Sequence, residues 1–405
     1  MIDESTLTKS ILINVVMGRH DGSMLDRPTV TPSDAPIVAP PGLKGVIVTD
    51  TAVGSVRGDE GFFHYRQYDA GALARNTAIE DIWHLLIVGH LPDDREAVAF
   101  RQRIGAKRVV APETLELVAD LARRVQPPHL VLQAALPLLL PDARPTLDLE
   151  HEQRVDDVLT IGAAVPTVLA VVRSVREGRP LSAADPGRGH AADWLAMASD
   201  RRPSEQQVRA VETYLAATVD HGLNASTFAT RVVTSTGADA AGALGAGVAA
   251  LAGPLHGGAP ARALGMIDEI GDPAATEAWL TPRLERGEKI MGFGHAVYRA
   301  DDPRSTLMRE VALGFGGPLV ERAIEIERRI LRQFRAFKPD AVIVTNVEFY
   351  AGIVLHLAGL PPDAFTSCFT VSRVIGWGAH LVEQAADNKI VRPSSRYVGP
   401  APLAA

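Results

Sequence analysis

Two histidines that stand beside glycine, and one glutamate in a segment that closes with glycine, lie in three separate parts of the sequence. They are His256 in GPLHGG, His295 in GFGHAVYRADDPR and Glu348 in TNVEFYAG. Residues in such settings are usually delivered to a cleft by loops or helix ends rather than by the apolar face of a helix. A histidine can polarise a carbonyl or move a proton near neutral pH, and a carboxylate between apolar neighbours gains base strength through desolvation. The pattern predicts an acid–base site that collects all three residues.

Each of the three also has a structural interpretation that the local sequence leaves open. His256 is compatible with a residue that caps a helix end, and Glu348 with a glutamate that the helix dipole favours at an N-terminus. Arg299 and Arg304 follow His295 closely and suit a substrate with carboxylates or phosphates. The alternative for these arginines is pairing with Asp301 and Asp302 on a solvated surface.

Two further arginines are candidates for anion binding. Arg373 lies inside the apolar segment FTVSRVIGW, where an arginine needs either an internal salt bridge or a ligand carboxylate. Arg392 precedes Pro393 and is a second candidate.

Composition and motifs exclude several functional classes. With 405 residues, a net charge of -7 and a pI near 6.0, the chain is not expected to bind nucleic acid. The sequence contains no phosphate-binding G-x-x-x-x-G-K-[ST] loop, and the histidine spacing matches no local zinc motif, so no metal is expected. The only cysteine, Cys368, cannot form an internal disulfide, which favours a reducing, cytoplasmic location. It lies in an apolar stretch and is expected to be buried. Because the most apolar segments are shorter than a membrane span and contain proline, no membrane association is expected.

The elements that position these residues are expected to be mainly α-helical. Residues 42–56 are the only segment that favours a β-strand or hairpin. Thr77 with Glu80, and Ser204 with Gln207, have the spacing of capping boxes that begin helices, and Gly89 is expected to end the first of these helices. The segments 129–140 and 161–172 are expected to be core helices.

Shifts in composition predict the domain organisation. Residues 1–41 include a proline-rich arm or linker, 42–256 and 361–405 form a large helical domain, and 257–360 form a smaller helical domain with more charged helices. The segment 238–253 is built almost wholly from small residues, which predicts burial against another helix, in the same subunit or across a dimer contact.

The ordered motifs resemble the citrate synthase family. The resemblance covers roughly residues 42 to 400 and rests on GLKGV, YRQYD, DHGLNASTFATR, GPLHGG, GFGHAVYRADDPR, NVEFYAG, SRVIGW and RPSSRYVG. It implies a mainly α, two-domain homodimer with a cleft between a large and a smaller mobile domain. It also implies condensation of acetyl-CoA, as a co-substrate, with oxaloacetate to give citrate and CoA, without a bound cofactor or metal.

The resemblance also implies roles for individual residues. His256 would stabilise the enolate at the thioester oxygen, His295 would polarise the oxaloacetate carbonyl, and Glu348 would remove the methyl proton. The remaining matches imply binding roles: oxaloacetate for His221, Arg304, Arg373 and Arg392, the last from the other subunit, and a CoA phosphate for Arg299.

Two departures from the family pattern keep alternative functions open. The family's usual aspartate base is Glu348 here, and Gly222 stands where the family's DHE motif has its glutamate. One alternative is 2-methylcitrate synthesis from propionyl-CoA, because one methylene in an acyl pocket is worth only about 1 to 3 kcal/mol. The other is a catalytically impaired paralogue that binds oxaloacetate or CoA as a regulator.

Overall fold

The computed structural model describes residues 37–199, 202–295, 297–387 and 389–402, and the chain divides into two compact units, Met1–Asp50 and Thr51–Ala405. In the first unit, a short 3-10 helix, η1 (Pro41–Leu43), lies among exposed residues. Most of the arm predicted for residues 1–41 lies outside the described residues. The second unit contains every predicted site residue.

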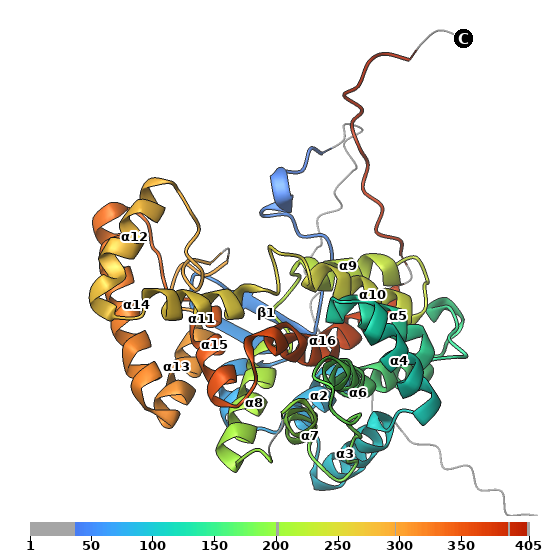
Figure 1. The fold of residues 1–405 in the computed structure, drawn as a ribbon. Helices are drawn as coiled ribbons and strands as arrows, with labels where there is room; N and C mark the ends of the chain where they lie inside the picture. Colours follow the sequence, from blue (N-terminus) through green and yellow to red (C-terminus); the bar gives the residue numbers. More distant parts are fainter. Residues whose placement is uncertain (1–36, 200–201, 296, 388, 403–405) are drawn as a thin grey trace, which may run out of the picture. The chain divides into compact units, whose positions relative to one another are not determined.

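The unit Thr51–Ala405 is mainly helical, which confirms the predicted fold class (Figure 1). Its strands are β1 (Gly54–Arg57), β2 (Phe62–Tyr65) and β3 (Tyr68–Asp69). The first helices are α1 (Ala70–Asn76), α2 (Ile79–Val88), α3 (Asp94–Arg108), α4 (Pro112–Arg124), α5 (Pro128–Leu139), α6 (His151–Arg176), α7 (His190–Ala198), α8 (Glu205–Thr218), α9 (Ala225–Thr234) and α10 (Ala240–Leu251). The later helices are α11 (Ala259–Ile270), α12 (Thr276–Glu285), α13 (Pro303–Phe315), α14 (Pro318–Phe337), α15 (Val347–Leu357) and α16 (Phe365–Asp387). Short 3-10 helices are η2 (Thr146–Asp148), η3 (Pro273–Ala275) and η4 (Pro362–Ala364).

The strands form one antiparallel sheet in the order β1-β2-β3. In β2, Phe63 and Tyr65 are buried while the alternate residues are partly exposed, as the two-residue period of a strand requires. The predicted extent of β-structure was wrong. The strand begins only at Gly54, and β2 and β3 follow in a segment that was not expected to contain strands. Ile47, in the apolar run that suggested an earlier strand, is 87% exposed, so that run lacks the packing that makes a strand favourable.

Two of the predicted helix boundaries are confirmed. Ser204 Oγ accepts a hydrogen bond from the backbone N–H of Gln207, and the Gln207 side chain accepts one from the backbone N–H of Ser204. Gly89 has a φ of 103° and ends α2, a left-handed conformation in which glycine carries no Cβ penalty.

The capping box predicted at Thr77 and Glu80 was wrong. Thr77 is the C-cap of α1, and α2 begins after Ala78 without a side-chain cap. The Glu80 carboxylate is buried and accepts a hydrogen bond from the backbone N–H of His190 at the start of α7. A tertiary contact therefore takes the carboxylate that the sequence pattern assigned to a local cap.

Helix α6 lies in the core, where it packs against α3, α4, α5, α7 and α16 (Figure 1). A Cβ on Gly162 would lie 2.8 Å from the ring of Trp83, so close packing at that point requires glycine. Among the described residues, α6 is the one helix long and apolar enough for a membrane span, and 83% of its most apolar window is buried inside the protein. It is therefore a core helix, as predicted for residues 161–172.

The small-residue segment forms α10, which packs against α5, α9 and α16. A Cβ on Gly247 would lie 2.6 Å from Thr230 Oγ1 and 2.9 Å from the ring of Trp377. The predicted burial against other helices of the same chain is confirmed, whereas a dimer contact stays a prediction.

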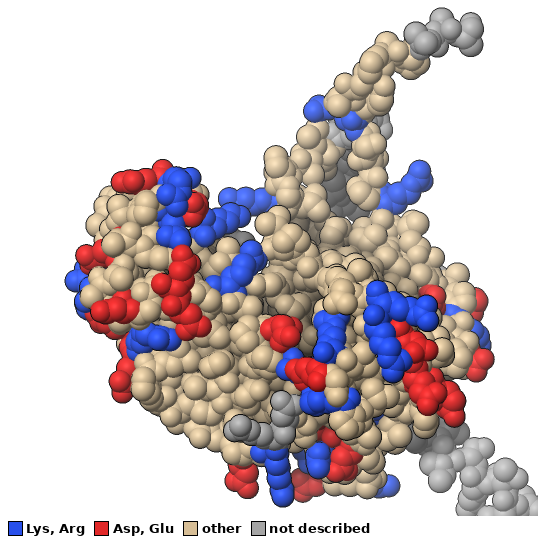
Figure 2. Space-filling view, viewed as in Figure 1, with Lys and Arg blue, Asp and Glu red and all other residues tan. Residues whose placement is uncertain are grey.

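Helices α11 to α15 form a second group of contacts, in which α13 and α11 pack against α15 and α12 packs against α14. The buried residues of α14 recur at helical spacing, from Val320 to Phe334, and leave a charged outer face. Lysines and arginines are interspersed with acidic residues over α12 to α14 in Figure 2, as expected for a solvated surface. The predicted boundaries of the smaller domain, 257–360, stay a prediction.

Candidate active site

A cavity of about 1100 Å³ lies within Thr51–Ala405. Its lining includes residues from β1, from the loops after α8 and α10, from the segment before α13, and from the starts of α13 and α15. Six predicted site residues line it: His221, His256, His295, Arg304, Glu348 and Arg373. The other two, Arg299 and Arg392, are exposed and are not among its lining residues. Their predicted contacts with CoA and with a partner subunit's site stay predictions.

His256 is held by the tight GPLHGG loop between α10 and α11. Its backbone N–H donates to the Gly253 carbonyl, and a Cβ on Gly257 would lie 2.4 Å from the Leu251 carbonyl oxygen, so only glycine fits there. Ring Nε2 lies 2.9 Å from the hydroxyl of Ser226. Among the described residues the other ring nitrogen, Nδ1, has no hydrogen-bond partner. Burial, with a smaller effect from Arg373, lowers the pKa of His256 to about 4, so the ring is neutral at pH 7.

The surroundings of His295 fix which of its ring nitrogens carries the proton. Nδ1 accepts hydrogen bonds from the backbone N–H groups of Val297 and Tyr298, at 2.9 and 3.0 Å. Burial and the neighbouring Arg304 lower the pKa of His295 to about 4. A neutral ring with an unprotonated Nδ1 must carry its proton on Nε2.

Nε2 of His295 lies 3.2 Å from Nη2 of Arg304. Because a guanidinium only donates hydrogen bonds, these two N–H donors compete rather than satisfy each other. A carbonyl or carboxylate oxygen between them would accept from both. The geometry therefore favours an oxygen-bearing, anionic ligand.

Arg304 is 5% exposed and is oriented by a carboxylate that is fully buried. Asp302 accepts hydrogen bonds from Nε of Arg304 at 3.0 Å, from Nη2 at 2.9 Å and from the backbone N–H of Val347 at 3.1 Å. Burial opposes ionisation of Asp302, but the charge and hydrogen bonds of Arg304 hold the pKa of this carboxyl below its usual value. Asp302 thus connects the start of α13, which carries Arg304, to the start of α15, which carries Glu348.

Arg373 lies on α16 and is 2% exposed. Its Nε donates to the Thr218 carbonyl at 2.9 Å, while Nη1 is a buried atom without a hydrogen-bond partner in the described part of the chain. Burial lowers the pKa of Arg373 to about 10, which still leaves it charged at pH 7. A buried, charged donor without a partner favours an anionic ligand in the cavity.

His221 lies between aromatic rings and a buried charge network. Its Nε2 lies 3.0 Å from the hydroxyl of Tyr298, and burial, with the charges of Arg304 and Arg373, lowers its pKa well below the usual value. The preceding residue, Asp220, lies 3.0 Å from Nε2 of His380. His221 is therefore a neutral hydrogen-bonding group at pH 7.

Glu348 lies in the first turn of α15, after the N-cap residue Asn346. The Asn346 side chain accepts from the backbone N–H of Glu348 and donates to the Gly294 carbonyl at 2.9 Å, which joins this helix to the segment that carries His295. Burial raises the pKa of Glu348 to about 7, although the charge of Arg304 lowers it in part. A carboxylate with this pKa is a suitable general base near neutral pH.

Two supporting groups of the site were not predicted from the sequence. Asp302 was considered only as a partner of arginine on a solvated surface, but it pairs with Arg304 in the interior. His380 accepts a hydrogen bond at Nδ1 from Arg231, and its Nε2 lies 3.0 Å from the Asp220 carboxylate. These three side chains form a buried series of polar contacts. The signal for Asp302 was its position before Pro303, where an aspartate caps a helix; no local signal pointed to His380.

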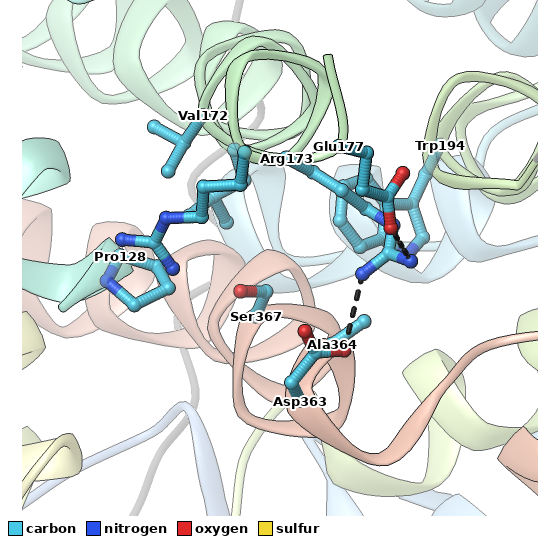
Figure 3. A pocket seen from close by; sticks show the side chains of 10 residues that line it. Pro128, Val172, Arg173, Glu177, Trp194, Asp363, Ala364 and Ser367 are labelled. Atoms are coloured by element: carbon cyan, nitrogen blue, oxygen red, sulfur yellow. Dashed lines mark hydrogen bonds and ion pairs between the residues drawn. The ribbon is translucent and has the colours of Figure 1, made fainter. Parts of the chain in front are cut away.

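Two other clusters lie outside the cavity. Figure 3 shows a small cavity of about 30 Å³, where Arg173 pairs with Glu177 and, at 3.1 Å, with Asp363. It has room for water molecules only, and its charges neutralise one another.

Among the described residues, one group could hold a metal ion: His84, His90 and Glu96. The Glu96 carboxylate already accepts from the backbone N–H of Asp93 at the start of α3 and lies 3.2 Å from Nε2 of His90, so the helix cap and the neighbouring histidine account for it.

Comparison with known proteins gives a consistent result. The family model for the citrate synthase C-terminal domain matches residues 42–394. The chain is 36% identical to the 2-methylcitrate synthase of Mycobacterium tuberculosis, over 88% of this chain and 90% of that protein. It is 33% identical to the citrate synthase of Haloferax volcanii, over 88% of this chain and 95% of that protein.

The structure is also similar to a solved ternary complex of carboxymethyl coenzyme A and oxaloacetate with citrate synthase from Thermoplasma acidophilum. The TM-score is 0.80, with 27% sequence identity, 89% of this chain and 96% of that chain covered. Sequence motifs, helical fold and cavity agree with the matches to the family model and its relatives, and the chain belongs to the citrate synthase family.

Proposed function

We propose that this protein is an acyltransferase that condenses acetyl-CoA with oxaloacetate and water to give citrate and CoA. One observation carries the proposal: a carboxyl group with a pKa of about 7, Glu348, shares a cavity with three neutral histidines and two buried arginines. This is the set of groups needed to ionise a weak carbon acid beside a dianionic acceptor. The solved ternary complex of a related citrate synthase, which contains oxaloacetate and a CoA analogue, supports the same pair of substrates.

In this mechanism, oxaloacetate binds first to the arginine side of the cavity. Arg304 and the unpartnered Nη1 of Arg373 would each bind a carboxylate oxygen by charge-assisted hydrogen bonds. The Nε2–H of His295 would donate to the keto oxygen and polarise the carbonyl carbon for attack. His221, neutral and hydrogen-bonded to Tyr298, would contribute a further contact to the substrate.

The acetyl group is activated on the other side of the cavity. Ionised Glu348 would remove a proton from the methyl carbon, and the enolate oxygen would be stabilised by His256. For that role Nδ1 of His256 would carry the proton and face the thioester oxygen, and Nε2 would accept from the Ser226 hydroxyl at 2.9 Å. The single hydroxyl hydrogen of Ser226 would then point to the ring instead of to Asn224 Oδ1, which lies 2.7 Å away.

Bond formation then joins the two substrates. The enolate carbon attacks the keto carbon, and the keto oxygen takes up the proton of His295 Nε2 to become the hydroxyl group of citryl-CoA. The proton held by Glu348 would restore the charge balance of the site. Hydrolysis of the resulting citryl thioester would release citrate and CoA. The reaction requires no redox step, and we propose no bound cofactor.

Several finer assignments belong to the same proposal. Arg299, exposed beside the loop of His295, would bind a CoA phosphate, and Arg392 would reach the cavity of a partner subunit in a homodimer. A cytoplasmic location is supported by the single cysteine, which is buried and cannot form an internal disulfide.

A second candidate, 2-methylcitrate synthesis from propionyl-CoA, is favoured by the 36% identity to a 2-methylcitrate synthase. The test compares kcat/KM for CoA thiol release with acetyl-CoA and with propionyl-CoA at saturating oxaloacetate. We expect acetyl-CoA to be preferred. A preference for propionyl-CoA would instead assign 2-methylcitrate synthesis to this protein. Tight binding of oxaloacetate by calorimetry, without CoA release from either thioester, would instead indicate a regulatory paralogue.

A further inference from the structure

Arg262 bridges the two ends of the loop that carries His256. It lies one turn into α11, and its Nη2 donates to the Pro254 carbonyl at 2.8 Å while its Nε donates to the Gly258 carbonyl at 3.3 Å. These carbonyls belong to the residues two positions before and two positions after His256. One planar guanidinium thus closes the loop around the histidine.

The loop depends on these hydrogen bonds because apolar packing supports little of it. Leu255, next to His256, is 93% exposed, so its side chain does not anchor the loop. The other backbone hydrogen bonds of the loop run from His256 to Gly253 and from Gly257 to Leu251, both on the α10 side, and the Thr366 hydroxyl on α16 donates to the Gly257 carbonyl at 3.2 Å. Arg262 supplies the connection to α11.

Arg262 also lines the cavity and acts on the base. The charged groups that act on Glu348 come from two other elements: Arg304 and Asp302 from the start of α13, and Arg262 from α11. The α8 residue Tyr214 faces Glu348 too, and its raised pKa keeps it neutral. Burial raises the pKa of Glu348, Asp302 raises it further, and the two arginines lower it.

We propose that Arg262 is a positioning residue for the condensation, which holds the loop of His256 in place and adjusts the electrostatic field at Glu348. This inference rests on the proposed function. It assigns Arg262 no contact with the reacting atoms.

Two substitutions separate the two parts of the role. Arg262→Lys keeps the positive charge, but one ammonium group does not match the fork that spans two carbonyl groups. Arg262→Gln removes the charge as well. Arg322→Gln is the matched control, because it removes a half-buried arginine that pairs with Asp268 outside the cavity.

The kinetic measurement is the pH dependence of CoA release. We expect kcat to fall about 10-fold in both variants, less than the roughly 100-fold cost of displacing a catalytic group by about 1 Å. The acidic midpoint of kcat/KM should move to higher pH in Arg262→Gln only, because removing a positive charge raises the pKa of Glu348. The control should match the wild type in both respects.

A second measurement does not depend on turnover. Amide hydrogen exchange in the peptide that spans residues 253–258 should be faster in both Arg262 variants than in the control. Unchanged exchange and an unchanged acidic midpoint would overturn the proposal. So would a rise in the KM for acetyl-CoA alone, since that result would make Arg262 a direct CoA contact. If the wild type releases no CoA at all, the proposed function fails instead, and the exchange result still reports on the loop.

Discussion

Replacing Glu348 by glutamine should stabilise the protein, and by an amount that depends on pH. The carboxyl group has an ordinary pKa of 4.5 and a pKa of about 7 in the folded protein, chiefly because the half-buried carboxyl is withdrawn from water. Folding therefore favours the protonated form. Between pH 4.5 and 7 the unfolded chain loses this proton while the folded protein keeps it, so stability falls over that range and stays lower at higher pH. Glutamine resembles the protonated carboxyl in shape and carries no charge, so the substitution removes this cost.

The magnitude follows from the difference between 4.5 and 7. At 1.36 kcal/mol per pH unit, the cost is about 3 kcal/mol at pH 8. The cost fades out below pH 4.5 and grows between pH 4.5 and 7. At pH 5 it amounts to less than about 1 kcal/mol. For 405 residues with an unfolding entropy of about 2.1 cal/mol/K per residue, 3 kcal/mol corresponds to a rise in Tm of about 4 °C.

The assay is thermal unfolding of the wild type and the variant at pH 5 and at pH 8. Glu321→Gln serves as the control, because this glutamate is exposed in the first turn of α14. The stabilisation by Glu348→Gln should be seen at pH 8 and nearly vanish at pH 5. A gain of the same size at both values, or a lower Tm at pH 8, would refute the argument that burial makes Glu348 a base.

Two further predictions concern the anionic substrate and its support. Arg373→Ala should raise the KM for oxaloacetate about 10-fold to 150-fold, because a charge-assisted hydrogen bond contributes about 1.5 to 3 kcal/mol. An unchanged KM would exclude a contact between Arg373 and the substrate. Asp302→Asn should lower the free energy of unfolding by about 3 to 5 kcal/mol, because it leaves the charge of Arg304 buried without its partner. In urea unfolding the exposed Asp301→Asn serves as control, and equal effects of the two substitutions would contradict the assignment.

Local sequence patterns predicted the residues that line the cavity better than the side-chain contacts that hold those residues in place. His256, His295 and Glu348 were recognisable because glycine or an N-cap residue must stand beside a side chain that a loop or helix end presents to a cavity. Arg373 was recognisable because a charged residue in an apolar helix needs an anionic partner. These signals lie within a few residues of each position, so the folded chain is not needed to read them.

The supporting contacts depend on distant segments and could not be read in this way. Asp302 joins Arg304 to the backbone of Val347, which lies in a separate helix. The Glu80 carboxylate serves α7 rather than its own helix. Arg392 is exposed and outside the cavity of its own chain, so its predicted role depends on a second subunit.

The most direct test of the account is the kcat for CoA release by Glu348→Gln with saturating acetyl-CoA and oxaloacetate. Removing the general base should lower kcat by about 100-fold or more, while calorimetry shows oxaloacetate bound as tightly as in the wild type. A general base contributes at least about 100-fold to the rate. A variant that keeps a kcat within about twofold of the wild type would therefore show that another group removes the methyl proton.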